Sequence, residues 1–109
     1  MRRGDVVIVS MPGDYGKPRP AILVQIDELT MHVDGVIVAP LTTTLLPAPL
    51  YRPTIRPSPE NGIMQISQVM TDKLSAVSKA KIAKTVGHAD AQTMTELDRT
   101  LAFVLGLAE

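Results

Sequence analysis

Closely spaced prolines prevent the middle of this chain from forming a helix. Proline inside a helix removes a hydrogen bond and clashes with the preceding turn, and the stretch from residue 47 to residue 59 contains Pro47, Pro49, Pro53, Pro57 and Pro59. Leu50–Arg52 and Thr54–Arg56 fit an edge strand, where a missing N–H group is tolerated. The Asn-Gly pair within Ser58–Gly62 predicts a hairpin turn.

Other segments have the composition of short strands. Strands are rich in β-branched residues and are bounded by Gly, Pro and polar clusters. On this basis we predict strands at Asp5–Ser10, Pro20–Ile26, Gly35–Ala39 (closed by Pro40), Ile63–Met70 and Ile82–Val86 (ended by Gly87). Asp27–His32 is predicted to form a loop or one helical turn, and Ser78–Lys81 one helical turn.

The C-terminal segment has the periodicity of a helix. Asp90 is a suitable N-cap, and Gly106 is a suitable terminator. An apolar stripe at spacings of three and four predicts the face turned to the core; it consists of Met94, Leu97, Leu101, Val104 and Leu105. Thr95, Asp98 and Arg99 are expected on the solvent side. The whole pattern predicts a single domain, residues 1–109, of the mainly β with α class: a strongly curved, barrel-like sheet with a helix packed on it.

Composition limits the classes of function. Aromatic residues make up 3% of the chain and Trp is absent, which argues against a base-stacking platform for single strands. The net charge is zero, but residues 1–86 carry ten Lys/Arg against seven Asp/Glu, and residues 87–109 one against four. This distribution is compatible with a local anion site. Cys is absent, which excludes disulfides and thiol nucleophiles. No segment resembles a signal peptide or a membrane span, so we expect a cytoplasmic protein without membrane partners.

Arg19 lies between Pro18 and Pro20, in a basic turn that leads into an apolar strand. Proline fixes its own φ and restricts the preceding residue to extended geometry, so the backbone of Arg19 is constrained on both sides. A guanidinium fixed at the mouth of a strand is suited to binding a phosphate or a carboxylate. The alternative interpretation is a surface turn in which Arg19 only increases solubility.

Elimination narrows the possible chemistry. His32 and His88 are far apart and lack ligand spacing, so we expect ordinary surface histidines and no metal. The chain has no phosphate loop that ends in Gly-Lys-Ser/Thr, and no His base accompanies a Ser or Thr nucleophile. The remaining polar residues suit anion recognition and phosphoryl transfer by charge stabilisation. Thr42–Thr44 follow a predicted strand, where hydroxyls bond phosphate oxygens or the local backbone.

The order of several motifs resembles the MazF/PemK family of toxin endoribonucleases from type II toxin–antitoxin modules. The motifs are Arg3–Val7, Lys17–Gln25, Val38–Thr43, Ala48–Leu50, Asn61–Ile63, Ser67–Lys73 and the helix end Leu105–Leu107. The resemblance spans nearly the whole chain. It implies an SH3-like curved β-barrel with a terminal helix, a homodimer, a cognate antitoxin partner, and DNA binding by the toxin–antitoxin complex.

The resemblance also implies an activity: metal-independent cleavage of single-stranded RNA, as by an mRNA interferase. The ribose 2′-hydroxyl attacks the phosphate and leaves a 2′,3′-cyclic phosphate and a 5′-hydroxyl, without a cofactor. The catalytic residues it implies are Arg19 and Thr42, and the RNA contacts we predict are Tyr15, Lys17, Thr43 and Gln68. Arg19 is a poor base, so we assign it charge stabilisation, with proton donation to the leaving oxygen as a second role. The general base is left open.

Two departures from the family pattern qualify this prediction. The loop Pro12–Pro18 is shorter than the usual one, and Ser67-Gln68 stands in place of a frequent Asp-Gln pair. Gln68 either touches a base or bonds the backbone of the strands. The alternative functions are a CcdB-like gyrase poison, disfavoured because the end Leu107–Glu109 contains no Trp, and a non-catalytic SH3-like binding module.

Overall fold

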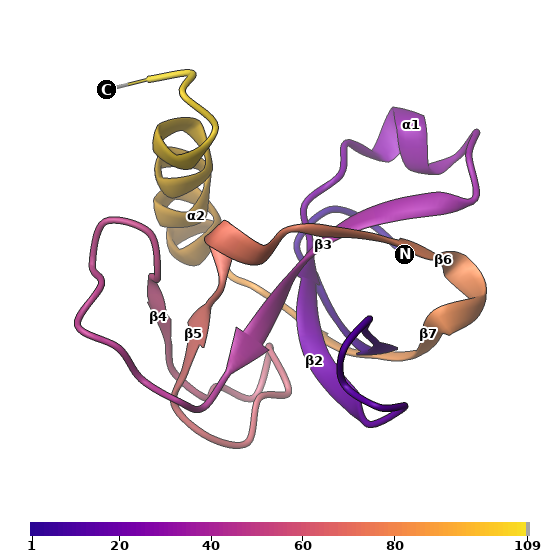
Figure 1. Ribbon diagram of the computed structural model, residues 1–109, viewed down its shortest axis with the longest axis horizontal. Helices are drawn as coiled ribbons and strands as arrows, with labels where there is room; N and C mark the ends of the chain where they lie inside the picture. Colours follow the sequence, from indigo (N-terminus) through magenta and orange to yellow (C-terminus); the bar gives the residue numbers. More distant parts are fainter. Residues whose placement is uncertain (109) are drawn as a thin grey trace.

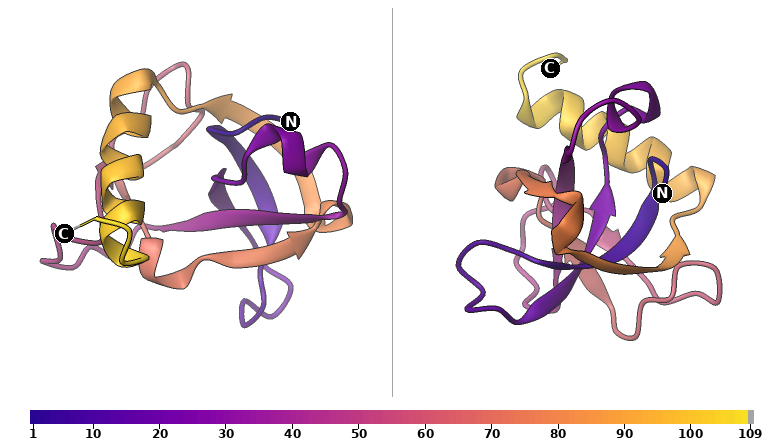
Figure 2. Two further views of the ribbon diagram at one scale, coloured as in Figure 1. Left: turned by 90° about the horizontal axis from the view of Figure 1, so that it is seen from above. Right: turned by 90° about the vertical axis from the view of Figure 1, so that its right-hand side faces the viewer.

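The computed structural model describes residues 1–108, which form one antiparallel sheet and a long C-terminal helix. The strands are β1 (Asp5–Ser10), β2 (Pro18–Leu23), β3 (Gly35–Thr42), β4 (Thr54–Ile55), β5 (Ser67–Val69), β6 (Ser75–Ser78) and β7 (Ile82–His88). Their hydrogen-bonded order is β4-β5-β3-β2-β1-β7, and β6 pairs with β3. The sheet is strongly curved (Figure 1), and a view from above shows it enclosing an interior (Figure 2).

The helices connect and cover this sheet. A single turn, α1 (Asp27–Thr30), lies between β2 and β3, and 3₁₀ turns η1 (Thr71–Lys73) and η2 (Lys79–Lys81) flank β6. The long helix α2 (Ala91–Val104) packs on one side, and the β1–β2 loop projects away from it (Figure 1, Figure 2). These elements confirm the predicted helical turns and C-terminal helix. Within residues 1–108, no helix combines the length and apolar character needed to cross a membrane.

Alternating side chains of β1 divide the core between the two faces of the sheet. Val6 belongs to a buried cluster that includes Leu97 and Leu101 of α2. Val7 and Val9 belong to a second cluster, which fills the interior of the curved sheet. Successive strand residues point to opposite faces, so the sheet is buried on both sides here, which explains the run of β-branched residues without polar alternation.

Helix α2 begins as predicted and ends its contact with the core earlier than predicted. The Asp90 side chain accepts a hydrogen bond from the Thr93 backbone N–H at 2.7 Å. Leu97 and Leu101 are buried, but Leu105 is 57% exposed, so its prediction as a core residue was wrong. The reason is its position: Leu105 is the C-cap, and the chain turns away immediately afterwards.

Two strands differ from their predicted ranges because prolines are tolerated within them. β2 begins at Pro18 rather than Pro20 and ends at Leu23 rather than Ile26. Arg19 therefore lies within the strand, opposite Val9 of β1. β3 continues through Pro40 to Thr42 rather than ending before the proline. A proline lacks only the donor, and the Pro40 carbonyl still accepts a hydrogen bond from the Met70 N–H at 2.8 Å.

The middle of the chain has less regular structure than predicted. Leu50–Arg52 is a turn, not a strand, because the N–H groups of Tyr51 and Arg52 both donate to the Ala48 carbonyl. The predicted strand Ile63–Met70 is longer than the observed β5, and Met64 is 90% exposed. Asn61 does not close a tight hairpin.

The Asn61 side chain instead organises a wider loop. Its oxygen accepts hydrogen bonds from the N–H groups of Ser58 and Ile63, and its amide donates to the Arg56 carbonyl. This loop packs against β7, which runs through Gly87 to His88, two residues beyond the predicted end at Val86. The strand β6 was not predicted; it pairs with the first half of β3.

Candidate functional site

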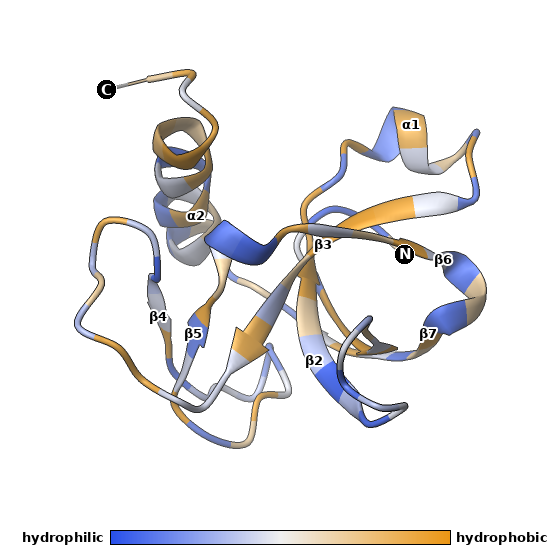
Figure 3. Cartoon of the chain, in the orientation of Figure 1, coloured by the Kyte–Doolittle hydropathy of each residue, from blue (hydrophilic) through white to orange (hydrophobic). Residues whose placement is uncertain are grey.

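A polar cavity of about 530 Å³ lies where the β1–β2 loop, the end of β3 and η1 meet. The polar residues that line it come from separate parts of the chain: Asp14, Arg19, Thr42, Thr44, Arg52, Lys73 and Ser75. Three of these side chains are cations and one is a carboxylate, so the cavity is electropositive. Hydrophilic segments are visible at the start of β2 and at η1 (Figure 3).

Arg19 is held in place by ionic and neutral hydrogen bonds. Its Nε and Nη2 atoms donate to the Asp14 carboxylate at 2.7 and 3.0 Å, and its Nη1 atom donates to the Leu41 carbonyl at 3.2 Å. The side chain is 33% exposed. At Pro18–Pro20, β2 pairs with β1 alone, since its pairing with β3 begins at Ala21. Arg19 is therefore an oriented group at the edge of the sheet rather than a free surface cation.

Thr42 faces the same cavity from the last position of β3. Its Oγ1 atom accepts a hydrogen bond from the Thr44 backbone N–H at 3.1 Å. Within residues 1–108, no acceptor takes the hydroxyl hydrogen of Thr42, so this donor is available to a ligand. Thr42 and Thr44 line the cavity and Thr43 does not, and the chain bends at Thr43 and Thr44, directly after β3.

Gln68 supports the cavity from behind. It is 6% exposed. Its Nε2 atom donates to the Leu46 carbonyl at 2.7 Å, and its Oε1 atom accepts from the Leu46 N–H at 3.0 Å. The sequence left two interpretations of Gln68 open, and this geometry agrees with the one in which its amide bonds the backbone. Gln68 also pairs with Thr42 across β3 and β5, so it fixes the segment that follows Thr42.

The remaining predicted RNA contacts lie outside the cavity. Tyr15 is 99% exposed and adopts a left-handed backbone conformation, with φ of 54°, at the tip of the β1–β2 loop. Lys17 is exposed on the same loop, and Thr43 is exposed beyond β3. The structure thus brings Arg19 and Thr42 together, and leaves these three residues around the cavity rather than in it.

Sequence reasoning missed three charged residues of the cavity: Asp14, Arg52 and Lys73. Arg52 is 8% exposed and donates from Nε and Nη2 to the Asp72 carboxylate, each at 3.1 Å. These hydrogen bonds hold the pKa of the Asp72 carboxyl below its ordinary value. The Arg-Pro dipeptide is not a sufficient signal, because it occurs at Arg19-Pro20, Arg52-Pro53 and Arg56-Pro57, and Arg56 does not line this cavity.

The histidines have structural surroundings. His32 is exposed, as predicted. His88 is not an ordinary surface residue: its Nδ1 atom lies 2.8 Å from Oδ1 of Asp5, which is 7% exposed, and the pair links β1 to β7. Among residues 1–108, no three His, Asp or Glu side chains are grouped closely enough to hold a metal ion.

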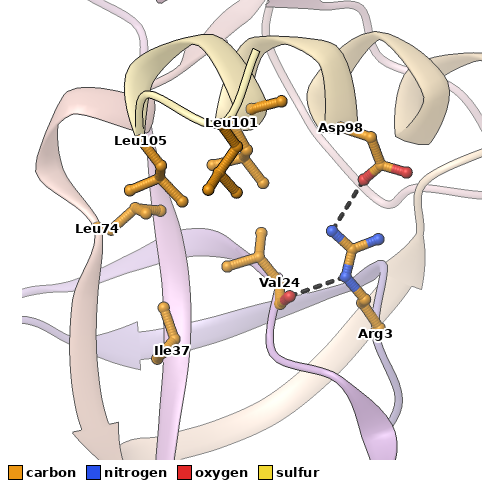
Figure 4. Close-up of a pocket in the computed structure, with 9 residues that line it drawn as sticks. Arg3, Val24, Ile37, Leu74, Asp98, Leu101 and Leu105 are labelled. Carbon is orange, nitrogen blue, oxygen red and sulfur yellow. Dashed lines mark hydrogen bonds and ion pairs between the residues drawn. The ribbon is translucent and has the colours of Figure 1, made fainter.

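A second cavity, of about 370 Å³, is mainly apolar and shares no residue with the first. It lies between the end of α2 and the strands, and Figure 4 shows Ile37, Leu74 and Leu105 around it. Arg3 closes one side by donating to the Asp98 carboxylate and to the Val24 carbonyl, each at 2.8 Å. The Arg3 guanidinium and the Asp98 carboxylate are paired with each other. The cavity therefore offers an apolar contact surface rather than a reactive site.

The chain is similar in sequence to known proteins over nearly its full length. A family model described as the PemK-like, MazF-like toxin of type II toxin–antitoxin systems matches residues 2–105. A probable endoribonuclease MazF of Mycolicibacterium smegmatis is 38% identical over 109 residues, and the match covers 99% of each chain.

Solved structures have the same fold. An endoribonuclease in complex with its cognate antitoxin, from Mycobacterial species, matches with a TM-score of 0.82 at 22% identity, covering 100% of this chain and 98% of that chain. The toxin MazF-mt6 of Mycobacterium tuberculosis matches with a TM-score of 0.82 at 21% identity, covering 96% and 99%. At these identities the likeness concerns the fold, and it confirms the predicted mainly β architecture with a curled sheet and a C-terminal helix.

Proposed function

Because the chain belongs to the PemK-like, MazF-like toxin family of type II toxin–antitoxin systems, we propose that it is an endoribonuclease that cleaves single-stranded RNA without a metal ion. One observation carries this proposal: Arg19 and Thr42, which are 23 positions apart in the sequence, line one electropositive cavity. Both residues offer N–H or O–H donors to an anion. The cavity volume of about 530 Å³ falls within the range of roughly 300–1,000 Å³ that is usual for ligand sites.

In the proposed reaction, the scissile phosphate lies between Arg19 and Thr42. A guanidinium has five N–H donors, and three of those of Arg19 bond Asp14 and Leu41. The remaining two, together with the Thr42 hydroxyl, are suited to the non-bridging oxygens. Negative charge grows on these oxygens as the 2′-oxygen attacks, so donors fixed in advance stabilise the transition state more than the ground state.

Asp14 is the candidate for the general base that the sequence left open. Among residues 1–108, it is the one carboxylate that lines the cavity, and a carboxylate within reach of the 2′-hydroxyl accepts its proton. The proton that the leaving 5′-oxygen requires comes from Arg19 or from solvent. The products are a 2′,3′-cyclic phosphate and a 5′-hydroxyl.

The proposal extends to partners and to location. One solved relative is described as an endoribonuclease in complex with its cognate antitoxin, and we propose a cognate antitoxin for this chain, with DNA binding by their complex. We also propose a homodimer. Leu105 and Leu107, 57% and 78% exposed beside the apolar cavity of Figure 4, are suited to contact with a second copy. Substrate and antitoxin are cytoplasmic molecules, so we place the protein there.

Purified protein incubated with single-stranded RNA in excess EDTA tests the activity. We expect cleavage to persist and the fragments to carry 2′,3′-cyclic phosphate and 5′-hydroxyl ends, identified by mass spectrometry. Loss of activity in EDTA that Mg²⁺ restores would contradict the metal-free mechanism. Parallel reactions with supercoiled DNA and gyrase test the gyrase alternative, and a protein that is inactive in both assays would support the binding module.

A further inference from the structure

Two cations in the polar cavity have no part in the reaction described above. Arg52 comes from the segment after β3, and Lys73 is the last residue of η1. Both line the cavity that contains Arg19 and Thr42. They are supplied by elements other than β2, so they extend the cationic surface of the cavity beyond Arg19.

Arg52 keeps a side-chain donor that no other residue in 1–108 uses. Its Nε and Nη2 atoms bond the Asp72 carboxylate, and no residue in 1–108 accepts a hydrogen bond from its Nη1 atom. No buried side-chain nitrogen or oxygen among these residues lacks a partner, so the Nη1 atom is not buried. Asp72 itself does not line the cavity. Arg52, and not Asp72, is therefore the member of this ion pair that lines the cavity.

Lys73 is an exposed ammonium group without an ion pair in residues 1–108. Ser75 and Thr44 line the same cavity and add hydroxyl groups. The Asp14 carboxylate, which also lines the cavity, is bound to Arg19. Anions are therefore the ligands that Arg52 and Lys73 are suited to bind, and the lysine provides the point charge that commonly binds phosphate.

Contacts with β5 and η1 hold Arg52 and Lys73 at fixed positions. The Val69 N–H donates to the Pro53 carbonyl at 2.9 Å, and the Thr71 hydroxyl donates to the Tyr51 carbonyl. These bonds fix the backbone on both sides of Arg52, next to the η1 turn that carries Lys73. The Arg52 guanidinium, which Asp72 also holds, therefore loses little conformational freedom when an anion binds.

We propose that Arg52 and Lys73 form a second phosphate subsite, which binds the phosphate next to the scissile one in the same RNA strand. This inference rests on the proposed function and adds to it a requirement on the substrate. An RNA with two consecutive phosphates binds better than a dinucleotide that carries only the scissile phosphate. The subsite contributes to substrate binding and not to the chemical step.

Binding of an uncleavable RNA tests the subsite. The probe is a short oligonucleotide with 2′-O-methyl groups, followed by fluorescence anisotropy over a series of salt concentrations. Lys73→Gln is the test variant, because Arg52→Gln would leave the Asp72 charge unpaired. Lys84→Gln is the matched control: Lys84 is exposed on β7 and lines neither cavity. We expect Lys73→Gln to weaken binding about two- to fivefold and to reduce the salt slope by about 0.7, with Lys84→Gln unchanged.

An uncharged methylphosphonate at one position of the oligonucleotide identifies which phosphate is bound. If Lys73 binds the neighbouring phosphate, removing that charge and removing the lysine have non-additive effects. Additive effects at both neighbours of the scissile position would overturn the assignment, as would equal affinities and slopes for Lys73→Gln and Lys84→Gln.

Wild-type protein separates the two proposals. Wild type that neither binds nor cleaves RNA contradicts the proposed function and the subsite together. Wild type that cleaves RNA, with a Lys73→Gln variant of unchanged KM, contradicts the subsite alone. The result we expect is a raised KM with kcat nearly unchanged for Lys73→Gln.

Discussion

Asp14 and Arg19 face each other as a fork, with Nε and Nη2 of the arginine 2.7 and 3.0 Å from the two carboxylate oxygens. The fork joins the β1–β2 loop to β2. It fixes the plane of the guanidinium, and it places a negative charge beside the cation that we assign to the scissile phosphate. The pair is electrically neutral, so Arg19 acts through directed donors more than through net charge.

Replacing Asp14 by Asn separates its two roles. Asp14→Asn removes the proposed base and a negative charge at little cost in shape. We therefore expect single-turnover cleavage to fall about 10²–10⁴-fold, while affinity for an uncleavable RNA increases. Quenched time courses measure the rate of cleavage, and fluorescence anisotropy measures the affinity for the uncleavable RNA. If Asp14 were only a counter-ion, the variant would bind RNA more tightly and still cleave it at nearly the wild-type rate.

Replacing Arg19 by Ala is expected to abolish cleavage and to leave the fold intact. The Asp14–Arg19 pair is partly exposed, and such pairs contribute at most about 1 kcal/mol, so the Tm should fall by about 5 °C or less. Arg19→Lys should restore little activity, because an ammonium group lacks the planar fork. Arg99→Ala, on the exposed side of α2, is the matched control. An active Arg19→Ala protein would end this assignment.

The Arg52–Asp72 pair should make stability depend on pH in the acid range. Hydrogen bonds from Arg52 lower the pKa of Asp72 in the folded state. The pair therefore stabilises the protein above the unfolded pKa of about 3.9, and this contribution is lost as pH falls through the lowered folded value. Because the Asp72 side chain is 34% exposed and solvent screens the pair, Asp72→Asn should reduce the free energy of unfolding by about 1 kcal/mol at pH 7 and by much less in strong acid.

Urea unfolding at pH 7 and in strong acid measures how much stability Asp72→Asn loses under each condition. Asp34→Asn is the control, because Asp34 is exposed and its carboxylate has no ion pair within residues 1–108. An equal loss of stability at both pH values would show that the charge of Asp72 is not what stabilises the fold.

The sequence predicted those elements whose residues specify them locally. The β-branched run of β1 and the capped, periodic helix α2 were predicted within one or two residues of their observed limits. β6 was missed because the four residues Ser75–Ser78 have no strong propensity. This segment becomes a strand because β3 supplies partners from Gly35 to Val38, and a pairing between segments so far apart leaves no local signal.

The same limit applies to the candidate site. Arg19 and Thr42 were predicted from a family resemblance, and the constraint of two prolines on Arg19 is local. Arg52 reaches the cavity because Asp72, 20 positions away, orients its guanidinium. From the sequence alone, Arg52 was predicted to lie on an edge strand. Its place in the cavity could not be predicted, because its ion pair with Asp72 exists only in the folded chain.

Gly87 should tolerate no side chain. A Cβ atom at this position would lie 2.3 Å from the carbonyl carbon of Asn61 and 2.4 Å from the carbonyl oxygen of Glu60. Both atoms are backbone, so neither moves without displacing the loop that the Asn61 side chain organises. Gly87→Ala should therefore destabilise the protein by about 3 kcal/mol or more. The matched control is Gly35→Ala in β3, where a Cβ would meet nothing within 4 Å.

Urea unfolding of the two glycine variants tests this contact. Gly35→Ala is expected to change stability by less than about 1 kcal/mol. If Gly87→Ala were as stable as Gly35→Ala, the loop and β7 would not be packed as closely as described.

The hydroxyl of Thr42 should matter more than that of Thr43. Thr42 lines the cavity with an unused O–H donor, whereas Thr43 lies outside it. Loss of one transition-state hydrogen bond typically costs about 10²–10³ in rate, so we expect Thr42→Val to slow single-turnover RNA cleavage by this factor and Thr43→Val to have little effect. Thr42→Val also removes the acceptor for the Thr44 N–H, so Thr42→Ser is the necessary companion: it keeps the hydroxyl and should restore most of the rate. Equal small effects of Thr42→Val and Thr43→Val would mean that these hydroxyls only satisfy the end of β3, and that Arg19 acts with another partner.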